Sequence, residues 1–143
     1  MSAYDRIING DLITARFGQW PSFHDAEVIS VLLGGHRPDK PFCEMLIHTW
    51  MMTDQVDDRG YYVQERHTLV TFRFEELIES EFLNFNGQNC LLELSIEEQN
   101  VENETVIRAE FPTSFGLEGT VICRRVVVKS VEQCDANGRT VHQ

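Results

Sequence analysis

This sequence of 143 residues lacks long apolar runs: no stretch approaches the roughly 20 residues that a membrane-spanning helix requires. Its first residues, Met1 to Arg6, do not place a cationic segment before an apolar one, so no secretory signal is visible. It also contains no Gly-x-Ser-x-Gly, no phosphate-binding glycine loop and no dinucleotide fingerprint, so these motifs give no support to nucleophilic or nucleotide-dependent catalysis. We therefore expect a cytoplasmic protein that is not an enzyme and has no membrane segment.

Cysteine is scarce, and its spacing predicts no metal site. The four cysteines, Cys43, Cys90, Cys123 and Cys134, form no Cys-x-x-Cys, and none lies near a histidine at a recognised zinc spacing. Three of them fall in expected strands, where a free cysteine behaves as a small apolar residue. We expect free thiols, no disulfides and no cofactor.

Basic residues are few, with 12 Lys and Arg against 23 Asp and Glu, for a formal charge of −11. Such a field repels phosphate backbones, which argues against general nucleic-acid binding. It favours association with a basic partner, although solubility alone is also a sufficient reason for it. The 42% hydrophobic and 24% charged content is that of one ordinary globular domain, spanning residues 1–143.

Short segments with a two-residue alternation of apolar and polar side chains predict a mainly β fold. We expect a single antiparallel sheet or a β-sandwich of about seven strands, with minor helix confined to the N-terminus. Asn86–Gly87 predicts a tight type I′ hairpin, and the tail after Cys134 is expected to fray. The expected helices cover residues 3–9 and 12–17, and the expected strands cover 26–33, 42–52, 61–74, 78–85, 88–97, 105–111 and 120–132.

The most specialised stretch runs from Trp20 to Glu27, with the sequence Trp-Pro-Ser-Phe-His-Asp-Ala-Glu. Pro21 prevents a helix from running through it, so we expect a structured corner before the first strand. His24 and Asp25 have two interpretations here. They are a general acid–base pair or metal ligands, or they fix the corner while Trp20 and Phe23 are buried, and we favour the second interpretation.

Five histidines raise the question of a metal site, and two of them fall on strands that we expect to pair. His48 and His67 can oppose one another across residues 42–52 and 61–74, and such a pair binds a transition metal when a carboxylate is near. A register shift of one residue would separate them. We favour an outer face on which His48 and Trp50 lie half-buried. The other histidines are His24, His36 and His142.

Several segments together resemble the immunity protein 50 family of bacterial polymorphic-toxin systems. They are Trp20-Pro21-Ser22-Phe23-His24-Asp25-Ala26-Glu27-Val28, His48-Thr49-Trp50, Phe85-Asn86-Gly87-Gln88-Asn89 and the closing segment from Gly119 to Val131. The resemblance implies a non-catalytic protein that binds and neutralises a cognate toxin. The charge suits a basic toxin such as a nuclease. The sequence predicts no oligomeric state.

The candidate binding residues are aromatic or lie in the corner. Exposed aromatics are the usual anchors of a protein interface, and Trp50 is the first choice because Trp20 is expected to be buried. Two other classes of function stay open. One is a ligand-binding β domain in which Trp20, His24 and Trp50 line a pocket, and the other is an enzyme that uses His24 and Asp25. The complete set of candidates is Trp20, His24, Asp25, His48 and Trp50.

Overall fold

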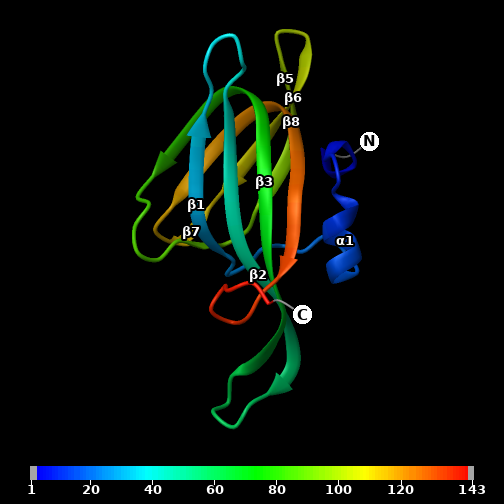
Figure 1. Cartoon of the computed structure of the whole chain (residues 1–143), viewed down its shortest axis with the longest axis vertical. Coiled ribbons are helices and arrows are strands. Elements are labelled where there is room, and N and C mark those ends of the chain that lie inside the picture. The colour runs from blue at the N-terminus through cyan, green and yellow to red at the C-terminus, as the bar shows by residue number, and fades with distance from the viewer. Residues whose placement is uncertain (1–2, 142–143) are drawn as a thin grey trace.

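The computed structural model describes residues 3–141 and contains a single antiparallel sheet of eight strands (Figure 1). The order across the sheet is β5-β6-β8-β3-β2-β1-β4-β7. The mainly β class and the single antiparallel sheet are confirmed. The elements are the 3₁₀ turn η1 (Ala3–Arg6), α1 (Asp11–Phe17), β1 (Glu27–Gly34), β2 (Phe42–Val56), β3 (Tyr62–Leu83), β4 (Cys90–Leu91), β5 (Ser95–Val101), β6 (Glu104–Phe111), β7 (Thr113–Phe115) and β8 (Glu118–Gln133).

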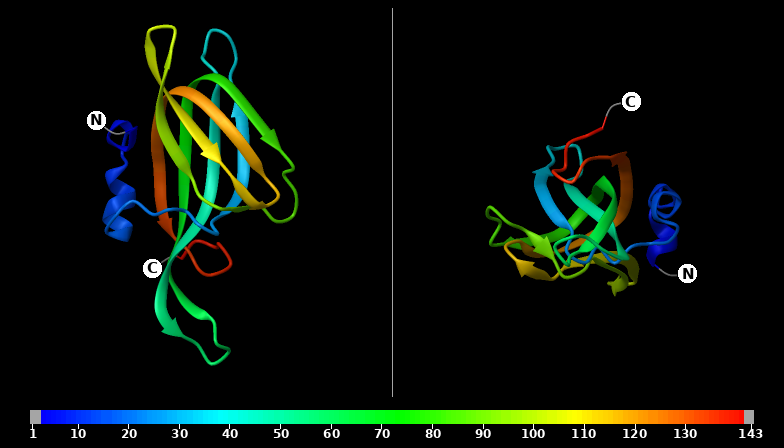
Figure 2. Two further views of the ribbon diagram at one scale, coloured as in Figure 1. Left: turned by 180° about the vertical axis from the view of Figure 1, so that it is seen from behind. Right: turned by 90° about the horizontal axis from the view of Figure 1, so that it is seen from below.

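Strands β3 and β8 are long, and they belong to both halves of a sheet that folds over on itself (Figure 2). β3 pairs with β2 as far as Glu75, whereas β6 pairs with β8 only over residues 119–123. Between the halves, the β3–β8 ladder shifts register from Leu77 to Glu79, and Glu76 adopts a positive φ of 55°. A bulge of this kind bends a strand and increases its twist, which lets one sheet enclose a core.

The core lies between the two halves of the folded sheet. Along β2, Cys43, Met45 and Ile47 point inward and are fully buried, as expected for a strand with one buried face. From the other half, Phe111 of β6 meets Phe74 of β3 edge to face, with ring centroids 5.9 Å apart. Burial of one such side chain contributes roughly 1.5–3 kcal/mol, so aromatic packing across the fold is a main source of stability.

Of the two expected N-terminal helices, the second is confirmed as α1, whereas the first is only the 3₁₀ turn η1, because Ile8 bonds to β8 instead of continuing a helix to residue 9. α1 buries Ile13 and Phe17 against the core, and it ends at Gly18, whose φ is 81° and whose N–H donates to the Thr14 carbonyl at 2.7 Å. Gly tolerates this left-handed conformation without a steric penalty. Among residues 3–141, no helix is long and apolar enough to span a membrane.

The segment before α1 covers an open edge of β8. Ile8 forms an isolated parallel bridge with Val127: its N–H donates to the Val126 carbonyl, and its carbonyl accepts from the Val128 N–H, both at 2.9 Å. This part of β8 lies beyond the end of its ladder with β6. The two bonds satisfy the Val126 carbonyl and the Val128 N–H on this edge, and Ile8 occupies the place where another chain would pair.

The prediction of a tight hairpin at Asn86–Gly87 is wrong. β3 and β4 do not pair with each other, and neither Asn86 nor Gly87 has a positive φ. Instead, the buried Asn89 side chain organises residues 84–89 as a wider loop. Its Oδ1 accepts from the N–H groups of Asn86 at 3.0 Å and Leu117 at 2.9 Å, and its Nδ2 donates to the Asn86 carbonyl at 2.7 Å. A non-local partner therefore overrides the local turn preference.

Three other expectations differ from the structure. The strands expected at 61–74 and 78–85 are one strand, β3, because the ladder to β8 continues past the bulge. The strand expected at 88–97 is divided between β4 and β5, and β7 occupies part of an expected loop. The tail does not fray directly after Cys134: the Asp135 carboxylate accepts from the N–H groups of Asn137 and Arg139, both at 2.9 Å, and closes a turn. His142 lies outside the described residues.

Candidate functional site

The β2–β3 hairpin projects well beyond the body of the sheet (Figure 1). We call residues 51–65 the arm. Its tip is ordered, because the Asp57 carboxylate accepts from the N–H groups of Arg59 at 2.9 Å and Tyr61 at 3.0 Å. Tyr61 and its neighbour Tyr62 are 69% and 61% exposed, so their rings present apolar surface to solvent at the far end of the molecule. Met52 and Val56 are also exposed on the arm.

Three of the aromatic side chains meet at the base of the arm. Nε2 of His48 lies 3.0 Å from Nδ1 of His67, and the Trp50 ring centroid lies 5.2 Å and 5.7 Å from those of His48 and His67. The residue opposite His48 in the ladder is Leu69. His67 reaches His48 because Arg66, with a φ of 54°, forms part of an irregularity that shifts the register. The two histidines therefore lie together although they are not opposite one another in the ladder, and His48 is buried, whereas only Trp50 is half-buried as expected.

The chemistry of this histidine pair favours a neutral state. Burial lowers the pKa of His48, with repulsion from His67 as a further cause, and burial also lowers the pKa of His67. A single hydrogen bond of 3.0 Å joins one donor nitrogen to one acceptor nitrogen, so the pair cannot hold it with both rings protonated. Within residues 3–141 no group of three or more His, Cys, Asp or Glu could hold a metal ion. The hydrogen bond between the two rings links β2 to β3 at the base of the arm.

The corner before β1 depends on two residues with positive φ, Phe23 at 62° and Asp25 at 64°. The Phe23 ring is buried, and the positive φ of this residue turns the chain sharply at that point. The Asp25 N–H donates to the Leu91 carbonyl at 2.9 Å, and the Leu94 N–H donates to the Ser22 carbonyl at 3.2 Å. Main-chain bonds thus fasten the corner to β4 and the segment that follows it.

His24 and Asp25 lie side by side on the exposed side of this corner. Nδ1 of His24 donates to the Leu92 carbonyl at 2.9 Å, and its Nε2 is 3.5 Å from Oδ2 of Asp25. The Ser22 hydroxyl accepts from the His24 N–H at 3.2 Å, as a turn-forming serine does. These contacts hold the corner together, and both side chains remain accessible to a partner.

Trp20 packs inside the corner and is half-buried. Its ring lies 5.1 Å from Tyr4, 6.1 Å from Phe23 and 6.2 Å from Phe72, centroid to centroid. It lines a surface cavity together with residues of η1 and α1. Trp50, by contrast, belongs to the base of the arm. Trp20 is therefore unsuited to anchor a partner, whereas Trp50 lies at the opposite end of the arm from the exposed Tyr61 and Tyr62.

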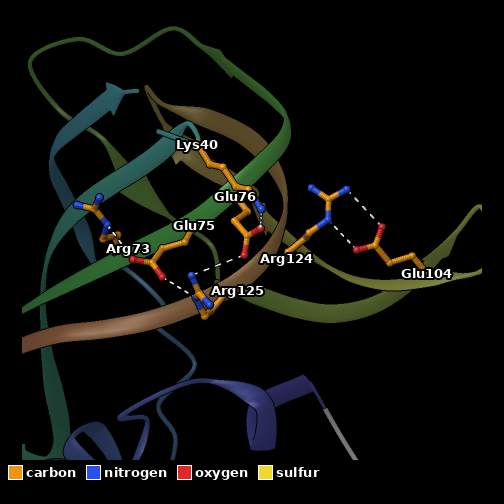
Figure 3. A network of polar contacts seen from close by, with 7 residues as sticks. All are labelled: Lys40, Arg73, Glu75, Glu76, Glu104, Arg124 and Arg125. Carbon is orange, nitrogen blue, oxygen red and sulfur yellow. Dashed lines mark hydrogen bonds and ion pairs between the residues drawn. The ribbon is translucent and has the colours of Figure 1, made fainter. Parts of the chain in front are cut away.

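A charged network covers the outer face of β3 and β8 near the bend (Figure 3). Glu75 accepts from Arg73 at 3.1 Å and from Arg125 at 2.6 Å. Lys40 binds Glu76 at 2.6 Å, and this hydrogen bond holds the pKa of Glu76 below its usual range. In the described part of the chain, seven of the 12 basic side chains lie in ion pairs: Arg6, Lys40, Arg73, Arg108, Arg124, Arg125 and Lys129.

Beyond the bend, most carboxylates of the outer face have no basic side chain as an ion-pair partner in the described part of the chain. Glu81, Glu110 and Glu118 line a cavity of about 310 Å³ on the outer face of β3, β8 and β6. Glu110 pairs with Arg108 at 2.6 Å, but within residues 3–141 no Lys or Arg forms an ion pair with Glu79, Glu81 or Glu118. The negative charge of Glu79, Glu81 and Glu118 is therefore not compensated by an ion pair in the described part of the chain.

No family model, curated protein or solved structure matches this chain. The sequence suggested the residues at the base of the arm and in the corner. It did not suggest the arm itself, although Tyr61–Tyr62 beside a strand was a visible sign of it. Nor did it suggest the unmatched carboxylates, because only the fold shows which acidic residues have no basic neighbour.

Proposed function

We propose that this chain is a non-catalytic immunity protein that binds and neutralises a cognate bacterial toxin, acting in the cytoplasm. The resemblance to the immunity protein 50 family suggests the partner. The observation that supports a binding role best is the arm, which carries two adjacent exposed tyrosines on a projecting, ordered hairpin. Tyrosine is enriched at interface hot spots because its rigid ring buries a large area and its hydroxyl still forms hydrogen bonds.

The charge distribution supports a basic partner. Ion pairs within residues 3–141 hold seven of the 12 basic side chains, so many of the acidic groups behind the net charge of −11 have no cationic partner. Such a field accelerates encounter with a cationic surface, and salt weakens it over a Debye length of about 8 Å at physiological ionic strength. We therefore expect the association rate to fall as salt rises, with a smaller change in the dissociation rate.

The test is co-expression with the toxin encoded beside this gene, followed by binding kinetics at low and high salt. The double substitution Tyr61→Ala, Tyr62→Ala should raise the dissociation rate at least about tenfold, because loss of a hot-spot residue costs about 2 kcal/mol or more. Phe115→Ala is the matched control, since Phe115 is 63% exposed but lies on β7. A toxin that stays active and forms no complex at low salt would disprove the proposal.

A further inference from the structure

One side of the folded sheet is open, and it is bordered by two strands with unpaired edges. β1 pairs with β2 along its whole length, but on its other edge it meets β4 only at Glu27, with one further bond from the Val28 N–H to the Asn89 carbonyl. Across the opening, β3 pairs with β8 beyond the bend. On its other edge, the last main-chain bond joins the Leu77 N–H to the Pro41 carbonyl. Residues 29–34 and 78–83 therefore have no strand on those edges in the described part of the chain.

The space between these two edges is an apolar groove of about 400 Å³. Val31 and Leu33 point into it from β1, because they stand opposite the inward-facing Met45 and Cys43 of β2. The groove is continuous with the core, since the ring of Phe82 lies 6.2 Å from that of Phe111. We call this the open-side groove. Its lining residues are Val31, Leu33, Phe82, Phe85 and Leu117.

A free edge beside an apolar groove is a site where proteins accept an added strand. The edge supplies main-chain hydrogen bonds, and the groove receives every second side chain of an extended segment, because strand side chains alternate with period two. The acidic residues Glu79 and Glu81 lie on β3, which borders the groove, and they have no basic partner within residues 3–141. Their negative charge favours a segment whose other side chains, those that do not enter the groove, are basic.

We propose that the open-side groove binds an extended segment of a partner protein, in which apolar residues alternate with Lys or Arg, as a strand added to the free edge of β1. This site is separate from the arm, and the inference does not depend on the identity of a toxin. The apolar side chains of the segment cover Leu33 and Phe85, which are 53% and 52% exposed. Its basic side chains lie in the field of Glu79 and Glu81.

The probe is a blocked heptapeptide, Lys-Val-Lys-Val-Lys-Val-Lys, titrated into the full-length protein and followed by NMR and calorimetry. A peptide of the same composition with four lysines followed by three valines is the control for charge without alternation. The alternating peptide should bind at least about tenfold more tightly, because only it places valines in the groove and lysines outside. Its binding should weaken with salt and in the double variant Glu79→Gln, Glu81→Gln.

Two neighbouring substitutions separate the groove from general electrostatic attraction. Leu33→Lys places a cation in the groove, whereas Leu32→Lys adds the same charge on the outer face, at a side chain that is 54% exposed. Leu33→Lys should weaken binding of the alternating peptide at least about tenfold, and Leu32→Lys less than about twofold. The arm substitutions Tyr61→Ala, Tyr62→Ala should leave it unchanged, so this result is independent of toxin binding.

Four results would overturn the proposal. They are no binding of the alternating peptide at millimolar concentration, equal binding of the two peptides, and equal effects of Leu33→Lys and Leu32→Lys. The fourth is a concentration-dependent dimer of the protein that Leu33→Lys converts to monomer, since a second copy would then be the occupant of the groove.

Discussion

The outer face of β3 contains two acidic stretches that differ completely in their surroundings. Before the bulge, Glu75 and Glu76 are held by Arg73, Lys40 and Arg125 in a network on the half of the sheet that carries β2 (Figure 3). After the bulge, Glu79 and Glu81 have no ion pair within residues 3–141, and they lie on the part of β3 that borders the open-side groove through Phe82. Residues of the same type on one strand thus serve stability in one place and are free for recognition in the other.

The largest effect that we expect concerns Gly116, which precedes Leu117 of the open-side groove and packs against residues 88 and 89. Gly116 has a φ of 75°, and a Cβ there would collide with the Gln88 carbonyl oxygen and the Asn89 side chain. Gly116→Ala should therefore lower the free energy of unfolding by about 3 kcal/mol, as expected for a buried clash added to a strained backbone. Urea denaturation measures this change.

Gly87→Ala is the matched control, because a Cβ at Gly87 meets nothing within 4 Å and the residue has no positive φ. Its effect should stay within about 0.5 kcal/mol. Equal effects of the two substitutions would contradict the close packing of Gly116 against Gln88 and Asn89.

Acid should weaken the His48–His67 pair and the Lys40–Glu76 pair in separate pH windows. The folded-state pKa values of His48 and His67 lie below the ordinary 6.5, so the unfolded chain binds protons more tightly and stability falls as pH drops below about 6.5. The pKa of Glu76 lies below the ordinary 4.5, so its contribution is lost only below about pH 4.5. Melting temperatures recorded from pH 7.5 to pH 3.5 measure both losses.

His67→Asn should reduce the fall in melting temperature below about pH 6.5, and Glu76→Gln should reduce the fall below about pH 4.5. His24→Asn is the control for the first substitution, because it removes a histidine without touching the pair. A slope between pH 7 and pH 5 that does not change in His67→Asn would contradict the assignment.

The smallest effects that we expect come from neutralising one glutamate in each of the two acidic stretches of β3. Glu75→Gln removes the charge that two arginines share, so it should lower the urea midpoint. Glu81→Gln relieves repulsion among three carboxylates of which only Glu110 has an ion-pair partner, so it should raise the midpoint slightly. Shifts of the same sign in both variants would mean that the two stretches do not differ electrostatically.

The sequence predicts those elements whose pattern is local. Period-two alternation locates β2 and β8, and Gly18 marks the end of α1. The bulge in β3 escaped prediction because a non-glycine residue, Glu76, adopts the positive φ. The wide loop after β3 depends on Asn89 reaching Leu117, a contact that no sequence window contains.

The candidate site shows the same division between local and non-local information. The proximity of His48 and His67 was predictable because both lie on one hairpin, but the irregularity that aligns them was not. The corner was predictable from Pro21 and the aromatic residues around it. The open-side groove was not, since it is defined by two edges that lack a partner strand, and a sequence does not show which edges stay unpaired.

The position of β8 has a consequence for the order in which the protein assembles. β8 lies between β3 and β6, yet it is the last strand of the chain. Until residues 118–133 leave the ribosome, β3 and β6 both expose main-chain groups, and Ile8 has no strand to bind. Because long-range pairing is slow, we expect the segment before residue 118 to lack a complete core until β8 is inserted between β3 and β6.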